Sequence, residues 1–158
     1  MAKRSAGILL YRSSPLRGEL QVLLVHPGGP FFVRRDEGVW SIPKGEYGDD
    51  EDARTAALRE FAEETGTVLD GAVVELHDLG EVRQGSGKRV RAWAAAGDLD
   101  ASAIVSNTFE LEWPPRSGRR QEVPEVDRAE WFAIAEARGR ILPAQQPLID
   151  RLVELLEA

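Results

Sequence analysis

The chain has 158 residues and carries 20 lysines and arginines against 27 aspartates and glutamates, which gives a formal net charge of −7 at pH 7. This length fits one domain with a substantial core, and the acidic balance disfavours a broad electrostatic grip on nucleic acid. The chain has no cysteine, which excludes disulfides, thiolate catalysis and cysteine-ligated zinc, and its two histidines disfavour a histidine-rich zinc site. Catalysis is therefore expected to depend on carboxylates.

The N-terminal segment contains Lys3 and Arg4, followed by an apolar run at residues 6–11. This run is too short for the core of a signal peptide or for a membrane span. We therefore expect a cytoplasmic protein that makes no membrane contact. Residues 5–11 and 20–26 are predicted to be paired strands, because both are rich in Leu, Ile and Val and a polar connection with Pro and Gly separates them.

The next segment combines a loop, a short strand and a helix. The Pro-Gly-Gly-Pro sequence at residues 27–30 predicts a loop, and residues 40–42 are expected to form a brief strand. A helix is predicted to begin at Asp49 or Asp50, either of which can cap free backbone N–H groups. Gly66 ends this helix, as a glycine just past the last turn commonly does.

The second half of the chain is predicted to add four strands and a closing amphipathic helix that begins near Pro143. The strands are expected at residues 73–79, 89–96, 108–113 and 128–132. Neither an internal repeat nor a linker divides the sequence, so residues 1–158 are expected to form a single domain. The order of elements predicts an α+β fold in which helices pack on both faces of a sheet.

The predicted helix carries an unusual cluster of charge. Arg59, Glu60, Glu63 and Glu64 fall within six consecutive positions, and residues three or four apart share one face of a helix. Glutamates that close repel each other unless a cation neutralises them. Magnesium is the expected cation, because hard divalent ions prefer carboxylate oxygens and can hold phosphates with their remaining sites.

The spacing around this cluster resembles the Nudix hydrolase box. Gly45, Glu51 and the sequence Arg-Glu-Phe-Ala-Glu-Glu-Thr-Gly at residues 59–66 match its pattern position for position, whereas Thr67 stands where an aliphatic residue is usual. The resemblance implies an α/β/α sandwich around a mixed sheet. It also implies hydrolysis of a nucleoside diphosphate linked to another group, with Mg²⁺ or Mn²⁺ as cofactor.

The resemblance also implies roles for individual residues. The positions similar to the family's metal ligands are the Gly45 carbonyl and the carboxylates of Glu60, Glu63 and Glu64. Glu60 and Glu63 are also counted with the catalytic residues, together with Arg59, whose guanidinium suits carboxylates and would orient the cluster. Glu51 is expected to be a structural or outer-shell partner rather than a ligand.

The general base is expected either in the box helix or at Glu125. Glu125 lies six residues before Trp131, which resembles the placement of a catalytic glutamate in small triphosphate-cleaving members of the family. The other reading of Glu125 is a surface ion-pair residue in an acidic loop, since such a loop can carry either role.

Basic residues near the box are candidate phosphate contacts, because guanidinium groups match phosphate geometry and a lysine beside Gly45 can reach a phosphate oxygen. These candidates are Lys44, Arg34, Arg35, Arg91, Arg116 and Arg119. Of the tryptophans, Trp113 is expected to be the one most available to a ligand, whereas Trp40, Trp93 and Trp131 are expected to pack in the core. His26 is expected to have a structural role at the end of a strand.

The expected function is magnesium-dependent cleavage of a phosphoanhydride in a nucleoside triphosphate, a dinucleoside polyphosphate or a related polyphosphate. An ADP-ribose or nucleotide-sugar pyrophosphatase is the alternative within enzymes. A Nudix domain that only binds a nucleotide is the alternative from another class, and it is disfavoured because every charged residue of the box is present. The expected partner is a small nucleotide or polyphosphate rather than nucleic acid, and a homodimer is compatible with the sequence.

Overall fold

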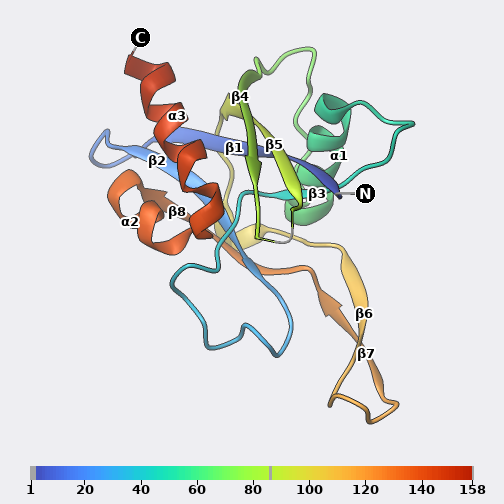
Figure 1. Cartoon of the computed structure of the whole chain (residues 1–158). Helices are drawn as coiled ribbons and strands as arrows, with labels where there is room; N and C mark the ends of the chain where they lie inside the picture. The colour runs from blue at the N-terminus through green and yellow to red at the C-terminus, as the bar shows by residue number, and fades with distance from the viewer. Residues whose placement is uncertain (1–2, 86, 158) are drawn as a thin grey trace.

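The computed structural model describes residues 3–85 and 87–157, in which a mixed six-stranded sheet lies between helices (Figure 1). Helix α1 (Ala53–Thr65) covers one face of the sheet, and α2 (Ile134–Arg140) and α3 (Gln146–Glu157) cover the other. Within these residues, no helix is both long and apolar enough to cross a bilayer. The predicted α+β sandwich is confirmed.

The sheet is organised around β1 (Arg4–Ser13). Its second half pairs antiparallel with β2 (Leu20–Pro27), its first half pairs antiparallel with β3 (Lys44–Glu46), and its other edge pairs parallel with β5 (Arg89–Ala96). The outer strands β4 (His77–Arg83) and β8 (Val126–Ala133) pair antiparallel with β5 and β2. The order is therefore β4-β5-β1-β2-β8, with β3 beside β1.

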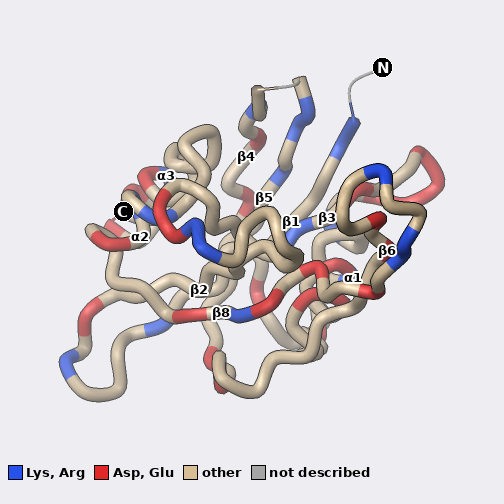
Figure 2. The backbone as a smooth tube through the Cα atoms, turned by 90° about the horizontal axis from the view of Figure 1, so that it is seen from below, with Lys and Arg blue, Asp and Glu red and all other residues tan. Residues whose placement is uncertain are grey.

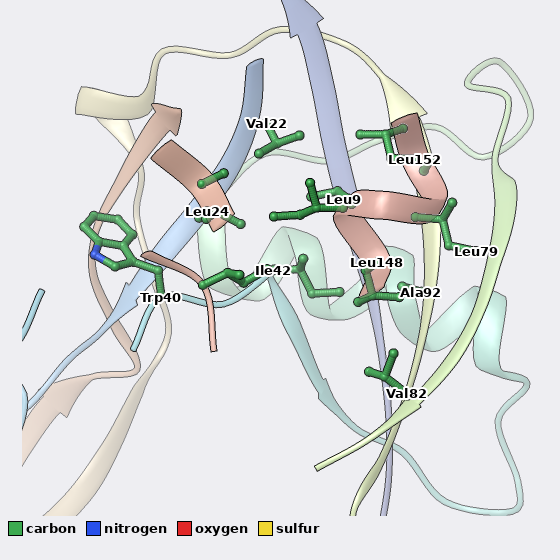
Figure 3. Packing of buried hydrophobic residues seen from close by; sticks show 14 of the residues in the cluster. Leu9, Val22, Leu24, Trp40, Ile42, Leu79, Val82, Ala92, Leu148 and Leu152 are labelled. Atoms are coloured by element: carbon green, nitrogen blue, oxygen red, sulfur yellow. The ribbon is translucent and has the colours of Figure 1, made fainter. Parts of the chain in front are cut away.

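The central strands are buried on both faces, so successive side chains enter two separate cores. In β1, Leu9 packs in the cluster under α3, whereas Ile8 and Leu10 pack in the cluster under α1. This alternation follows from the two-residue period of a strand. Figure 3 shows the α3 cluster, where Leu148 and Leu152 of the helix face Leu9 and Ala92 of the sheet.

The β6–β7 hairpin, residues 108–124, projects from the body of the protein and is called the arm below (Figure 1). It joins β6 (Thr108–Glu112) and β7 (Arg120–Pro124) as a separate two-stranded sheet. The Trp113 amide donates to the Arg119 carbonyl at 2.9 Å and closes the turn at its tip. The arm leaves the body next to Glu125, which follows β7 directly.

Several predicted boundaries were wrong. Residues 40–42 form two isolated bridges and no strand: Ser41 pairs with Val25 of β2, and Trp40 pairs with Ile141, the residue after α2. The helix begins at Ala53, since the Asp52 carboxylate accepts from the Thr55 amide at 3.1 Å, and Asp49 pairs with Arg4 instead.

Three further differences lie later in the chain. The strand predicted at 73–79 runs from His77 to Arg83 instead. It continues past Gly80, whose φ is +78°, because a bulge accommodates this glycine within the strand. Strand β7 and helix α2 were not predicted. The closing helix was predicted near Pro143, where a short 3-10 turn (Pro143–Gln145) leads into α3.

Candidate active site

The site begins where β3 passes beside α1. A Cβ atom on Gly45 would lie 2.0 Å from Oε2 of Glu60, so only glycine lets the Glu60 carboxylate reach the backbone of β3. Strand β3 is held in turn by β1, since Ala6 pairs with Gly45 and the Ile8 amide donates to the Pro43 carbonyl at 3.1 Å. The turn and the glutamate helix are therefore fixed against each other.

Gln145 holds the segment before β3 from the C-terminal side of the chain. Its side chain is fully buried, its Oε1 accepts from the Ile42 amide at 3.1 Å, and its Nε2 donates to Ser41 Oγ at 3.0 Å. These bonds satisfy buried polar groups that would otherwise be costly. The position of Lys44 thus depends on a residue about a hundred positions away.

Arg59 organises the carboxylates of the box. It donates to both oxygens of Glu51, through Nε at 2.9 Å and Nη2 at 2.8 Å. Its Nη1 donates to Glu60 at 2.8 Å and to Glu63 at 3.2 Å. The Arg59 guanidinium also holds the pKa of the Glu51 carboxyl below its usual range. Glu51 therefore positions Arg59, as an outer partner would.

Glu64 and Glu60 are buried, and burial changes their acidity. Burial raises the pKa of Glu64 to about 8, with Lys44 opposing the shift and Glu125 adding to it. Burial also raises the pKa of Glu60, against the opposing effect of Arg59. An ionised carboxylate in such a place is stabilised when a cation binds. The site is thus short of positive charge at its centre.

These side chains line one polar hollow of about 280 Å³, called the carboxylate pocket below. Its lining residues are Lys44, Gly45, Glu46, Glu60, Glu63, Glu64, Lys88, Asn107 and Glu125. Backbone bonds bring the distant members in: the Asn107 amide donates to the Glu63 carbonyl at 2.8 Å, and the Glu125 amide donates to the Asn107 carbonyl at 2.9 Å. Glu125 therefore lies at the pocket, where a distal base is expected.

Lys88 is a pocket residue that the sequence interpretation missed. It precedes β5, and burial together with the nearby charge of Lys44 lowers its pKa. Figure 2 shows basic segments at the neighbouring starts of β1 and β5, where Arg4 pairs with Arg89. A lysine in a turn gives no signal in sequence, and only the pairing of β5 with β1 brings it to the glutamates.

The other predicted basic residues are not among those that line the carboxylate pocket. Arg35 lines a neighbouring hollow of about 280 Å³ that shares Lys44, Glu64 and Glu125 with the carboxylate pocket. Arg91 pairs with Asp78 at 2.6 Å. The exposed residues Arg34, Arg116 and Arg119 lie in the loop after β2 and at the tip of the arm, and they are not among the residues that line the carboxylate pocket.

The aromatic residues lie largely as expected. Trp40 and Trp93 are buried, and Trp131 is partly buried against the core under α1. Trp113 is partly exposed on the arm and makes an edge contact with Phe31, with ring centroids 5.0 Å apart. His26 is fully buried, with Nδ1 2.8 Å from Asp127 and Nε2 2.6 Å from the Arg35 carbonyl, so it holds the loop after β2 next to the start of β8.

The chemistry of the donor set fits a hard divalent cation, because carboxylate oxygens and a backbone carbonyl are the ligands that Mg²⁺ and Mn²⁺ accept. Among the described side chains, no three acidic or histidine groups converge into a preformed cage. Arg59 instead occupies Glu60 and Glu63. Ion binding would therefore draw these carboxylates away from Arg59 while Glu51 keeps the guanidinium in place.

Sequence comparison connects the chain with known proteins. A family model described as NUDIX domain matches residues 1–152. The RNA pyrophosphohydrolase of Rhizobium meliloti (strain 1021) is 29% identical over 127 residues, which are 73% of this chain and 71% of that protein. The RNA pyrophosphohydrolase of Dinoroseobacter shibae (strain DSM 16493 / NCIMB 14021 / DFL 12) is 58% identical over 31 residues, which are 20% of this chain and 19% of that protein.

Solved structures share the fold. A C. elegans Ap4A hydrolase binary complex superposes with a TM-score of 0.65 at 21% identity, covering 99% of this chain and 98% of that one. The NUDIX domain of Shewanella oneidensis NrtR, complexed with ADP ribose, superposes with a TM-score of 0.64 at 20% identity, covering 99% and 89%. At these identities the likeness shows the architecture alone.

Proposed function

We propose that this chain, which belongs to the NUDIX family, is a metal-dependent pyrophosphohydrolase. Its proposed reaction is the cleavage of a phosphoanhydride bond in a nucleoside polyphosphate. One observation carries the proposal. Five glutamates and two lysines line the same pocket, namely Glu46, Glu60, Glu63, Glu64, Glu125, Lys44 and Lys88. Carboxylates that hold cations, next to ammonium groups that bind phosphate, are what hydrolysis of an anionic anhydride requires.

Glu60, Glu63, Glu64 and the Gly45 carbonyl would hold the ion, for which we propose Mg²⁺ or Mn²⁺. When bound, the ion supplies charge neutralisation at the phosphate and lowers the pKa of a coordinated water. Arg59 keeps the glutamates oriented, since its contacts to Glu51 fix the guanidinium. Arg59 therefore holds Glu60 and Glu63 close to each other until the ion binds.

Lys44 and Lys88 flank the carboxylates and bind the phosphate oxygens of the substrate. Glu125 lies on the same pocket, and its carboxylate takes the proton from the attacking water. The lowered pKa of Lys88 reflects burial and the neighbouring charge of Lys44. Two lysines that close repel each other until an anion lies between them, which favours phosphate binding.

A second candidate substrate is a triphosphate at an RNA 5′ end. The two curated relatives named RNA pyrophosphohydrolase favour it, whereas the formal charge of −7 opposes a broad contact with RNA. ADP-ribose is a third candidate, since the NrtR domain was solved with it. A domain that only binds nucleotide is disfavoured, because Arg59 and all the box glutamates are present.

The proposal is tested by incubating a panel of substrates with Mg²⁺, Mn²⁺ or EDTA and identifying the products by chromatography, so that nucleotides and sugar phosphates are detected as well as phosphate and pyrophosphate. The panel contains nucleoside triphosphates, dinucleoside polyphosphates, a 5′-triphosphorylated RNA oligonucleotide, ADP-ribose and a nucleotide sugar. We expect turnover only with a divalent ion, and its loss in Glu64→Gln. Metal-independent turnover, or unchanged turnover in Glu64→Gln, would overturn the ligand assignment. Absence of turnover with every substrate would overturn the proposed function.

A further inference from the structure

A second hollow, of about 360 Å³, opens beside the carboxylate pocket and is called the aromatic groove below. It lies between the arm and the loop of residues 28–38. Its lining residues are Pro27, Gly28, Phe32, Phe109 and Glu125. Glu125 also lines the carboxylate pocket, and Phe32 also lines the neighbouring hollow that contains Arg35 and Lys44. The groove is therefore continuous with the proposed site of phosphate cleavage.

Aromatic side chains gather at this groove although they are exposed. Phe109 of the arm is 38% exposed, and Phe31 of the loop is 55% exposed and contacts Trp113. In the part of the chain that the structure describes, these are the exposed large aromatic residues. Phe109 lines the groove itself, and Phe31 directly precedes Phe32, a partly buried residue that also lines it. Aromatic surface left open to water next to a polar pocket marks a place where a ligand binds.

The groove is built by close packing at its floor. A Cβ atom on Gly28 would lie 2.0 Å from the Pro124 carbonyl oxygen, and the Gly28 amide donates to the Glu125 carbonyl at 2.9 Å. The loop and the base of the arm therefore pack so closely that a side chain at position 28 would clash with the arm. The far end of the loop is fixed by buried His26, whose Nε2 donates to the Arg35 carbonyl.

The chemistry of the walls selects the occupant. Pro27, Phe32 and Phe109 present apolar and aromatic surface, and Glu125 supplies the acidic group of the groove. A sugar or an inositol ring would need several hydrogen-bonding side chains, whereas a planar ring buries its faces on aromatic side chains. The basic side chains lie on the side toward the carboxylate pocket. One of them is Arg35, whose Cζ atom lies 5.6 Å from the centre of the Phe32 ring.

We propose that the aromatic groove binds the nucleobase of the substrate by stacking on Phe32 and Phe109, while the phosphates lie in the carboxylate pocket. This inference rests on the proposed function. It orients the substrate, with its base toward the arm and its phosphate chain toward Lys44 and Lys88. It also names the substrate class, since a polyphosphate without a base leaves the groove empty.

The first test is an NMR titration of the metal-free protein with adenosine, guanosine, cytidine and uridine. Uncharged nucleosides are used because they report on the groove without the metal site. We expect shifts of the Phe32 and Phe109 ring resonances with at least one nucleoside. We also expect Phe109→Ala to weaken binding about 5- to 100-fold, the range for loss of one stacking partner, and Phe109→Trp to retain it.

Val33→Ala is the matched control, since Val33 is 65% exposed in the same loop and is not one of the groove's lining residues. Shifts confined to other residues, or equal nucleoside affinity in Phe109→Ala and the wild type, would overturn the inference. This result does not depend on catalysis, so it stands even if the proposed function fails.

The second test compares a nucleoside triphosphate with inorganic tripolyphosphate under Mg²⁺. We expect Phe109→Ala to raise KM for the nucleotide by about the same 5- to 100-fold factor as it weakens nucleoside binding. KM for tripolyphosphate and kcat should stay unchanged. An equal rise in KM for both substrates would contradict base stacking at Phe109. Hydrolysis of neither substrate by the wild type would count against the proposed function instead, and the NMR titration then decides the groove alone.

Discussion

Arg59 and Glu51 form a two-point ion pair, in which Nε lies 2.9 Å from one carboxylate oxygen and Nη2 lies 2.8 Å from the other. Such bidentate pairs fix orientation as well as charge. Because Glu51 occupies two of the three guanidinium nitrogens, Nη1 is left to contact Glu60 and Glu63. Glu51 thus contributes to the site by determining where Arg59 points.

Replacement of Arg59 is therefore expected to impair the metal site more than the fold. Arg59→Ala leaves Glu60 and Glu63 without their shared donor, and loss of such a supporting contact typically costs 10- to 100-fold in metal affinity or activity. We expect the Mg²⁺ concentration for half-maximal activity to rise, or kcat/KM to fall, within that range. Arg54→Ala, in the same helix, removes only an exposed contact to the Gly71 carbonyl and serves as control. Equal effects of the two variants would contradict this role.

Glu64 is expected to make stability depend on pH in the absence of metal. Its folded pKa of about 8 lies above its ordinary value of 4.5, so the folded protein holds a proton that the unfolded chain releases. The free energy of unfolding should then decrease as pH rises from about 5 to 8. Glu64→Gln removes this loss. In EDTA at pH 8 we expect the variant to be more stable by about 4 kcal/mol, or roughly 8–16 °C in Tm.

Two controls define that measurement. At pH 5 both proteins carry a neutral group at this position, so their Tm values should agree closely. Added Mg²⁺ should raise Tm of the wild type and not of Glu64→Gln, because a ligand that binds only the folded state stabilises it. A variant less stable than the wild type at pH 8 in EDTA would show that the Glu64 carboxylate is not strained by burial.

Glu125 is expected to act on the proton and not on the metal. Glu125→Gln keeps the size of the side chain and removes its basicity, so kcat should fall about 100-fold or more, as for loss of a general base. The Mg²⁺ dependence should change little. Glu130→Gln, an exposed glutamate of the following strand, is the matched control. Normal activity of Glu125→Gln would transfer the base role to the box helix.

The sequence located the helix and its carboxylates because their spacing is local. Glu60, Glu63 and Glu64 lie within one and a half turns, so the period of a helix alone places them on neighbouring faces. The fold class followed in the same way, since the apolar runs of β1, β2 and β5 are buried on both faces and read as continuous strands.

Features that depend on tertiary pairing were not predictable in this way. Lys88 reaches the pocket only because β5 pairs with β1, and Gln145 supports Ile42 across 103 positions. The segment from Trp40 to Ile42 has the composition of a strand, yet its two bridges go to distant parts of the chain, at Val25 and Ile141. The aromatic groove likewise forms between segments distant in sequence, so nothing in the sequence pattern predicted that Phe32 and Phe109 would line the same groove.

Lys88 and Arg119 provide a contrast between a pocket residue and an exposed one. Lys88 lines the carboxylate pocket, so Lys88→Gln should raise KM for every phosphate substrate, by about 10-fold as for one charged hydrogen bond. Arg119 lies at the tip of the arm, so Arg119→Ala should raise KM for longer phosphate chains more than for short ones. Arg17→Gln, in the exposed β1–β2 connection, is the control. Equal effects of Arg119→Ala on both chain lengths would make Arg119 a bystander.

Gln145 is expected to determine stability and, through Lys44, activity. Gln145→Leu conserves approximate size but leaves the buried Ile42 amide without its acceptor, and an unsatisfied buried donor costs about 1–3 kcal/mol. We expect Tm to fall by roughly 4–8 °C, and kcat/KM to fall at temperatures where the variant remains folded, because Lys44 and Gly45 follow the loosened segment. The control is Gln146→Ala, at the next position, because the Gln146 side chain donates only to the carbonyl of exposed Arg138. This variant should change neither Tm nor kcat/KM appreciably. Unchanged activity in a destabilised Gln145→Leu would show that β3 holds Lys44 through its pairing with β1 alone.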